Sequence, residues 1–187
     1  MQKILFILGQ LTDVDVEWLI QSGVRRKFPR HTHLIEEGQP NDHFFILLDG
    51  HVSVSVDGKG EVDVLGSGEV LGEMSLVDSR PPSATVTALE DCYALTLSHE
   101  ELRRHVEENH DFGMRFYRAL ATFLSQRLRG EHAAEFNDEV GLLTDREQEG
   151  ELDGYVLDTV QMAGARFDRL LKKMMSARLE GRGLEEG

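Results

Sequence analysis

Short apolar segments with a two-residue period fill the sequence between Val24 and Ser98, and turn residues, mostly glycine, separate them. In Val52–Val56 valine alternates with serine, as in a strand with one buried face. Asp-Gly steps flank this segment and tolerate the positive φ angles of tight hairpins. Many short strands with regular turns predict a sandwich or a rolled barrel. The predicted strands are Thr32–Ile35, Phe44–Leu48, His51–Val56, Val62–Leu65, Ala84–Ala88 and Cys92–Leu97.

Helices are expected on both sides of this β region. Thr12 and Asp15 make a capping pair at the start of the first helix, and Gly23 ends it. After the last strand, Ser98 caps a second helix. A longer helix is predicted from Asp111 to His132, because apolar residues form a continuous stripe along it. The stripe consists of Phe112, Phe116, Leu120, Phe123, Leu124 and Leu128.

The composition changes beyond the long helix. Residues 135–153 are rich in carboxylates and have Arg146 as their only fixed cation, which predicts a solvated acidic linker. Residues 154–180 form an amphipathic helix with apolar residues spaced 4-3-4-3-4, typical of a helix seam that packs within the chain or in a homodimer. The seam consists of Val156, Val160, Ala163, Phe167, Leu170 and Met174. Residues 1–134 are then one domain that includes the long helix.

The net charge of −14 argues against nucleic-acid binding, because an acidic chain is repelled by phosphates. No basic recognition helix follows the long helix, so DNA binding by this chain alone is not expected. The apolar run Met1–Leu8 is too short for a signal peptide, and no segment reaches the roughly 18 apolar residues of a membrane helix. We expect a cytoplasmic protein without membrane contact. Cys92 is the only cysteine, which excludes an intramolecular disulfide.

The segment that bears most directly on function runs from residue 71 to 86. A strand turns at a glycine into about one helical turn, and a proline-interrupted loop leads to the next strand. Backbone N–H groups at the start of a short helix receive anions. Ser83 and Thr85 offer hydroxyl donors, Glu73 offers an acceptor for a sugar hydroxyl, and Arg80 offers a guanidinium for a phosphate.

This segment resembles the phosphate-binding cassette of the cyclic-nucleotide-binding domain family, which includes catabolite activator proteins and protein kinase A regulatory subunits. The resemblance covers about Leu11 to Arg129 and rests on Gly-Glu-Met-Ser-Leu at 72–76 and Ser-Ala-Thr-Val at 83–86. Residues 34–38 and 45–50, each ending in glycine, match as well. The resemblance implies a mainly β fold with α: a double-stranded β-helix, or jelly roll, flanked by an N-terminal helix and C-terminal helices.

The resemblance also implies a ligand, cAMP or cGMP, and a set of ligand-binding residues. Glu73 corresponds to the residue that holds the ribose 2′-hydroxyl, and the backbone of 72–75 would face the cyclic phosphate. The family's phosphate-binding arginine should immediately precede Ser83, where this sequence has Pro82. Either Arg80 replaces that arginine or the site is degenerate. The ligand-binding residues implied are Gly72, Glu73, Met74, Ser75, Arg80, Ser83, Ala84 and Thr85.

The function implied is that of a regulatory or adaptor module in signal transduction, which senses a small ligand and acts through contacts with a protein effector. A homodimer is expected through helix 111–132 or the C-terminal helix. We expect no enzyme, because the sequence has no serine elbow, Walker-type loop or paired catalytic acids.

Two alternatives remain at this point. The chain is an interaction module without a small ligand, or it is a metal-dependent enzyme of the cupin type. The second rests on His31, His33 and Glu37, whose HxHxxxE spacing supplies metal ligands in cupins. The further cupin stretch with its additional histidine is missing, and no metal or other cofactor is expected.

Overall fold

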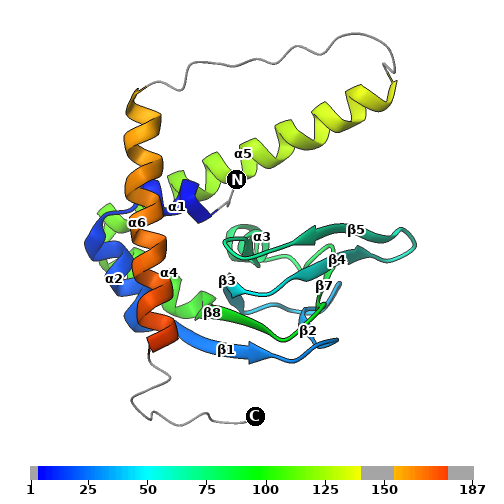
Figure 1. The fold of residues 1–187 in the computed structure, drawn as a ribbon, viewed down its shortest axis with the longest axis horizontal. Helices are drawn as coiled ribbons and strands as arrows, with labels where there is room; N and C mark the ends of the chain where they lie inside the picture. Colours follow the sequence, from blue (N-terminus) through cyan, green and yellow to red (C-terminus); the bar gives the residue numbers. More distant parts are fainter. Residues whose placement is uncertain (1–3, 140–153, 177–187) are drawn as a thin grey trace.

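The computed structural model describes residues 4–139 and 154–176, with side chains at 4–5, 7–125 and 162–174. The helices are α1 (Ile4–Gln10), α2 (Asp13–Ser22), α3 (Glu73–Asp78), α4 (His99–Glu108), α5 (His110–Glu139) and α6 (Gly154–Ser176). The strands are β1 (Val24–Phe28), β2 (His33–Ile35), β3 (His43–Asp49), β4 (Val52–Val56), β5 (Gly60–Leu65), β6 (Val70–Leu71), β7 (Thr85–Ala88) and β8 (Cys92–Ser98). In Figure 1 the strands lie on the right, α1, α2, α4 and α6 gather on the left, and α5 runs from that group across the top of the view.

The strands make two antiparallel sheets, with the orders β1-β8-β3-β6 and β2-β7-β4-β5. Only β4 and β5 are neighbours both in sequence and in a sheet. Elsewhere the first part of the chain pairs with the last: β1 and β3 flank β8, and β7 lies between β2 and β4. The chain thus passes back and forth between the two sheets and pairs early strands with late ones, which is the jelly-roll arrangement. The expected fold class, a β-roll with flanking helices, is confirmed.

Strand β3 is apolar from Phe44 to Leu48 because both of its faces are buried there. Phe45 and Leu47 point between the sheets, into a cluster that we call the roll core; Phe44 and Ile46 point to a second cluster, the helical core. The roll core consists of Leu34, Ile35, Phe45, Leu47, Val52, Val54, Leu65, Leu71, Val86, Ala88, Cys92 and Ala94. The helical core joins β3, β6 and β8 to α1–α6, and its largest side chains include Ile4, Leu8, Leu19, Phe44, Leu97, Phe112, Phe116 and Phe167.

The capping predictions for two helices are confirmed. Thr12 accepts from the backbone N–H of Asp15, and the Asp15 carboxylate accepts from the backbone N–H of Thr12, which completes a capping box at α2. The hydroxyl of Ser98 accepts from the backbone N–H of Glu101 at the start of α4. The apolar run at the beginning of the chain forms α1, which the sequence reading did not anticipate. Ile4, Ile7 and Leu8 are buried in the helical core.

Helix α5 begins at His110 and continues to Glu139, so it is longer than predicted. Residues 135–139, the first part of the expected acidic linker, are therefore helical, and residues 140–153 lie outside the described residues. The side chain of Leu128 also lies outside them. None of the described helices is both long enough and apolar enough to cross a membrane.

Helix α6 contains the predicted seam and packs against α1 and α2 (Figure 1). Its buried residues Ala163, Phe167, Leu170 and Met174 all join the helical core. In the described part, the seam thus contacts its own chain; the side chains of Val156 and Val160 and residues 177–180 lie outside that part.

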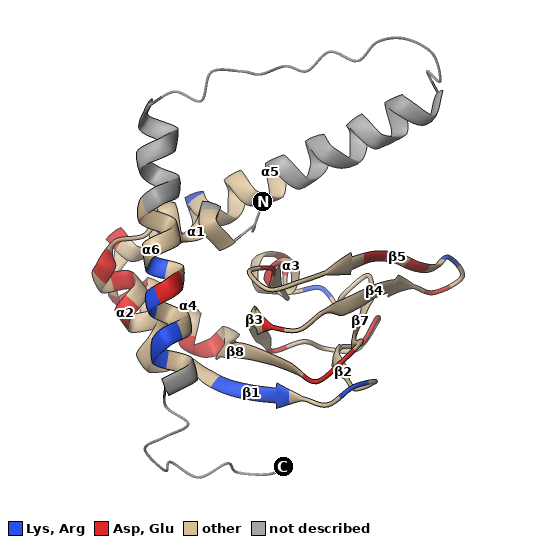
Figure 2. Cartoon of the chain, viewed as in Figure 1, with Lys and Arg blue, Asp and Glu red and all other residues tan. Residues whose placement is uncertain are grey.

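Opposite charges accompany this packing. Figure 2 shows acidic residues on α2 facing basic residues on α6. Arg166 Nε lies 2.8 Å from Asp13 Oδ1, and Lys173 pairs with Glu17. Arg166 Nη1 also donates to the Leu8 carbonyl at 2.9 Å, which ties α6 to α1.

Candidate functional site

The short helix α3 is bracketed by two residues in the left-handed region. Gly72 precedes it with φ +80°, and Ser79 follows it with φ +58° and donates its backbone N–H to the Ser75 carbonyl. A Cβ on Gly72 would lie 2.3 Å from the His43 carbonyl oxygen and 2.7 Å from Nδ2 of Asn41. Both the backbone angle and the available space therefore require glycine at this position.

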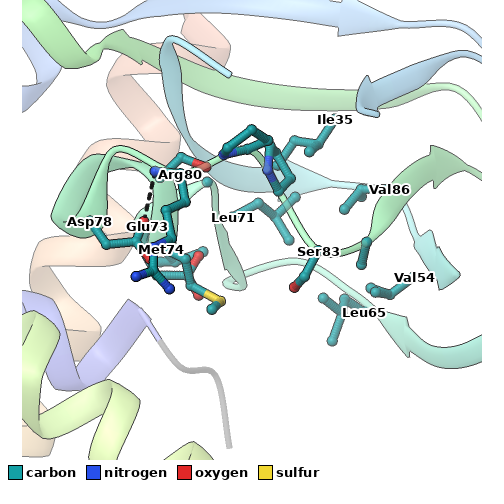
Figure 3. A pocket seen from close by; sticks show the side chains of 16 residues that line it. Ile35, Val54, Leu65, Leu71, Glu73, Met74, Asp78, Arg80, Ser83 and Val86 are labelled. Atoms are coloured by element: carbon teal, nitrogen blue, oxygen red, sulfur yellow. Dashed lines mark hydrogen bonds between the residues drawn. The ribbon is translucent and has the colours of Figure 1, made fainter. Parts of the chain in front are cut away.

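A cavity of about 250 Å³ opens beside α3 (Figure 3). Its size is just below the range for small-molecule sites, which is about 300–1,000 Å³. Glu73, Met74 and Arg80 lie on the α3 side of the cavity in Figure 3, while strands of the roll supply the opposite wall. The residues of that wall are mostly roll-core members: Ile35, Val54, Leu65, Val70, Leu71 and Val86.

The structure brings most of the predicted site residues together. The predicted residues that line the cavity are Gly72, Glu73, Met74, Ser75, Arg80, Ser83 and Ala84. Thr85 does not line it: the Thr85 hydroxyl accepts the backbone N–H of Glu37 at 3.0 Å. Because successive strand residues point to opposite faces, Ala84 and Val86 face the cavity and Thr85 faces away. The sequence prediction included Thr85, and the structure places its hydroxyl on the face of β7 away from the cavity.

The polar groups of the cavity come from α3 and the loop after it. Glu73 lines the cavity and is only 3% exposed. Arg80 is exposed, and its backbone N–H donates to Asp78 Oδ1 at 3.0 Å. Among the described residues that line the cavity, Arg80 is the only one with a positive charge. An anionic group bound here would therefore meet its guanidinium and no other fixed cation in the lining.

Pro82 lines the same cavity as Arg80. Its carbonyl accepts the backbone N–H of Gly38 at 2.9 Å, which fixes the loop before β7 against the turn after β2. Proline has no side-chain donor and no backbone N–H, so this position presents an apolar ring where the family pattern has a guanidinium. The site is thus more apolar than the sequence resemblance alone implies.

The sequence reading missed the apolar wall opposite α3. Val54 and Val86 face the cavity from β4 and β7, which pair with each other in the sheet. The alternation of valine and serine in β4 indicates which face is buried, but it does not say which buried residues border an opening. Ile35 and Leu65 reach the cavity from β2 and β5, so this wall is assembled from segments far apart in sequence.

The three residues of the cupin-like pattern do not converge. His31 lies in a turn with φ +68°, and His33 Nδ1 lies 2.9 Å from the Thr87 hydroxyl. The Glu37 carboxylate accepts the backbone N–H of Asp57 at 2.8 Å. Across residues 4–139 and 154–176, no described group of three or more His, Cys, Asp or Glu side chains is arranged to hold a metal ion.

Comparison with known proteins places this geometry in a family. The family described as cyclic nucleotide-binding domain matches residues 25–109. The N-terminal domain of a transcriptional regulator from Streptomyces coelicolor A3(2) is 30% identical, with a TM-score of 0.57 over 72% of this chain and 95% of that one. A cyclic nucleotide-binding domain from Methylobacillus flagellatus is 26% identical, with a TM-score of 0.61 over 76% and 84% of the two chains.

A third structure, the regulatory domain of Toxoplasma gondii PKA crystallised with cAMP, is 28% identical, with a TM-score of 0.50 over 55% of this chain and 42% of that one. The fold and the site thus define a regulatory ligand-binding domain, a class that is generally not enzymatic. The chain belongs to the cyclic nucleotide-binding domain family. The resemblance stated from the sequence is confirmed.

Proposed function

We propose that this chain is a non-enzymatic regulatory module that binds cAMP or cGMP beside α3 and passes the signal to a protein effector. The observation that carries the proposal is the two-sided cavity: polar groups of α3 and Arg80 on one side, and apolar roll-core side chains on the other. A cyclic nucleotide has the matching division between an anionic sugar phosphate and an aromatic base. Convergent polar groups at one end of an apolar pocket are typical of small-molecule sites.

Each part of the cavity has a role in this proposal. The ribose 2′-hydroxyl donates to the buried carboxylate of Glu73, and the cyclic phosphate lies against the backbone of 72–75 with Arg80 as its cation. Ser83 contributes its hydroxyl, and the base packs against the wall that contains Val54 and Val86. The relatives support this assignment: one carries the description of a cyclic nucleotide-binding domain, and another was crystallised with cAMP.

The contacts of α3 supply a route for the signal. Arg103 of α4 donates from Nη2 to the Leu76 carbonyl at 3.3 Å and to the Ser79 hydroxyl at 3.2 Å, so α3 is tied to α4. Helix α4 packs on α5, and both join α6 in the helical core. We propose that ligand binding changes the position of helix 111–132 and thereby the exposure of the α6 seam. Such a change requires that the ligand bind one of the two states more tightly.

The exposed surface of α5 supports a homodimer in this proposal. Met114 is 69% exposed and Tyr117 is 38% exposed, although the opposite face of the same helix is buried. Two copies of such a helix cover each other's apolar side chains. The output then passes through a dimeric, cytoplasmic protein to an effector, without DNA binding by this chain itself.

The test is a calorimetric titration of the full chain with cAMP and with cGMP. We expect saturable heat for at least one nucleotide, and Arg80→Ala should weaken its affinity about ten- to a hundredfold, because a charge-assisted phosphate contact contributes roughly 1.5–3 kcal/mol. Arg104→Ala is the matched control, since Arg104 is exposed, pairs with Glu101 at 3.7 Å and does not line the cavity. The absence of both heat and a thermal shift at millimolar nucleotide would contradict the proposal.

A second candidate is an interaction module that takes no small ligand. Pro82 favours it, because the side of the cavity where the family pattern has an arginine is apolar. In that case both nucleotides fail to bind, while the oligomeric state measured by light scattering is the same with and without nucleotide. An oligomeric state that depends on nucleotide supports the regulatory module instead.

A further inference from the structure

A second cavity, of about 200 Å³, adjoins the first and shares Ser75, Arg80 and Pro81 with it. It is bounded by the loop before β3, the end of α3 and the start of α4. The other residues that line it are Pro40, Asn41, Asp42, Ser79, His99 and Arg103. In contrast to the first cavity, most of these side chains are polar or charged.

Among the described residues that line this cavity, His99 is the one with a buried polar atom that lacks a hydrogen-bond partner. The residue is 4% exposed, and its Nε2 atom has no hydrogen-bond partner among the described residues. Its backbone N–H donates to the Asp42 carbonyl at 2.8 Å, and the backbone of Gly72 is a hydrogen-bond partner of the ring. Burial lowers the pKa of the ring, and the charge of Arg103 lowers it further, so the imidazole is neutral at neutral pH. Nε2 is then an acceptor without a donor.

Two guanidinium groups stand at the same cavity. Arg103 is held in place by the Leu76 carbonyl and the Ser79 hydroxyl, which engage only its Nη2 atom. Arg80 lines both cavities. Asp42 carries the only carboxylate among the described lining residues, so the fixed side-chain charges sum to +1 with a neutral His99. Such a site favours an oxyanion, and the planar fork of arginine suits phosphate geometry.

We propose that this second cavity binds inorganic hydrogen phosphate. Its anionic oxygens accept from Arg80 and Arg103, and its P–OH group donates to Nε2 of His99, which satisfies the buried acceptor. A cyclic nucleotide does not fit this requirement, because its phosphate is a diester without a P–OH group. The proposal therefore goes beyond the proposed function and does not depend on it.

The test follows the backbone amide resonances of Ser79, Arg80 and residues 99–103 while the ¹⁵N-labelled full chain is titrated with sodium phosphate, without nucleotide and at constant ionic strength. We expect saturable shifts confined to these residues and their neighbours. Sodium sulfate, an oxyanion without a proton at neutral pH, should bind at least about tenfold more weakly, because it leaves Nε2 without a donor. Equal affinity for the two anions, or shifts that do not saturate, would overturn the proposal.

Three variants distinguish phosphate binding in this cavity from a general effect of protein charge on phosphate affinity. Arg103→Gln should weaken phosphate binding at least about tenfold, and Arg104→Gln, the same charge change at the neighbouring exposed position, should leave it unchanged. Asp42→Asn should strengthen phosphate binding severalfold, because it removes the one carboxylate. Asp42 is exposed and its backbone contact to His99 is retained, so this variant tests the site even if Arg103→Gln disturbs α3. Unchanged affinity in Asp42→Asn together with Arg103→Gln would sink the proposal.

Discussion

Strand β3 contributes side chains to two cores that differ in how tightly they are packed. On one face, Phe45 and Leu47 enter the roll core, several of whose members also line the candidate ligand cavity. On the other face, Phe44 packs edge-on against Phe116 with ring centroids 5.9 Å apart, and Phe116 stacks on Phe112 at 5.4 Å. The roll core therefore leaves room for a ligand, whereas the helical core places its largest rings in direct contact.

This difference suggests that one core borders the cavity while the other stabilises the fold. A core that borders a cavity gives up part of its packing, and the adjoining core has to hold the fold together. The helical core also contains the elements of the proposed signal route, α4, α5 and α6. Substitutions in the two cores should consequently separate stability from ligand binding, with stability effects larger on the helical side.

The largest expected effect is that of Phe116→Ala. Phe116 is 1% exposed, and its removal should lower the free energy of unfolding by about 3–5 kcal/mol, as is usual for a buried aromatic ring. Val54→Ala removes two methyl groups from the cavity wall and should cost only about 1–2 kcal/mol. Urea denaturation of both variants measures the difference. Equal costs would mean that the cavity is closed by packing in solution and that the two cores do not differ.

The next effect concerns the turn that begins the cassette. Gly72→Ala meets both a positive φ and the His43 carbonyl, so it should cost about 2 kcal/mol or more, of which the left-handed angle alone accounts for roughly 1–2 kcal/mol. Gly58 has φ +75° with open space around its Cβ position, and Gly58→Ala is therefore the matched control for the angle without the clash. Thermal denaturation should show Gly72→Ala as the less stable variant, and the reverse order would contradict the close approach at α3.

A large part of this fold could be predicted from local sequence patterns. The valine–serine alternation of β4 and the capping residues of α2 and α4 specify their elements through neighbouring residues alone. Strand β1 was missed because it reads Val-Arg-Arg-Lys-Phe, with basic residues at its centre. It is an edge strand paired only with β8, and Arg25 lies over the Tyr93 ring at 4.2 Å, so tertiary contacts hold it in place.

The candidate site was predictable only on its α3 side. The cassette is one continuous stretch of sequence, so its residues could be named together from the family pattern. The opposite wall depends on which β-strands become neighbours, and that information lies in long-range pairing such as that of β4 with β7. The second cavity could likewise not be predicted from the sequence, because His99 and Asp42 come together only when the start of α4 meets the loop before β3.

A third prediction concerns the ion pair between Asp15 of α2 and Arg115 of α5. Asp15 is buried and accepts from Arg115 at 2.8 and 2.9 Å. Burial raises the pKa of this carboxyl, but the hydrogen bonds from Arg115 and Thr12 outweigh it, and the net pKa is lowered. The ionised form therefore stabilises the fold above the carboxyl's ordinary pKa of about 3.9, and that contribution is lost as the pH falls through the lower folded-state value.

Asp15→Asn should consequently cost about 1–2 kcal/mol at pH 7, and the difference from the unmodified chain should shrink as the pH falls from about 4 to 2. Urea denaturation at several pH values measures it. The exposed Asp168→Asn is the control and should show almost no change at any pH. A cost that stays constant down to pH 2 would show that the ion pair with Arg115 does not stabilise the helical core.

The smallest expected effect is that of Thr85→Val, and it tests the side of β7 on which the ligand lies. The Thr85 hydroxyl accepts from the Glu37 backbone outside the cavity, so its loss should leave nucleotide affinity unchanged and cost about 1 kcal/mol of stability. Ser83→Ala is the counterpart within the cavity lining and should weaken nucleotide binding severalfold through the lost hydroxyl. Calorimetry with both variants distinguishes the two faces. If Thr85→Val weakens binding more than Ser83→Ala, then the ligand lies on the other face of β7, and the cavity wall has been misassigned.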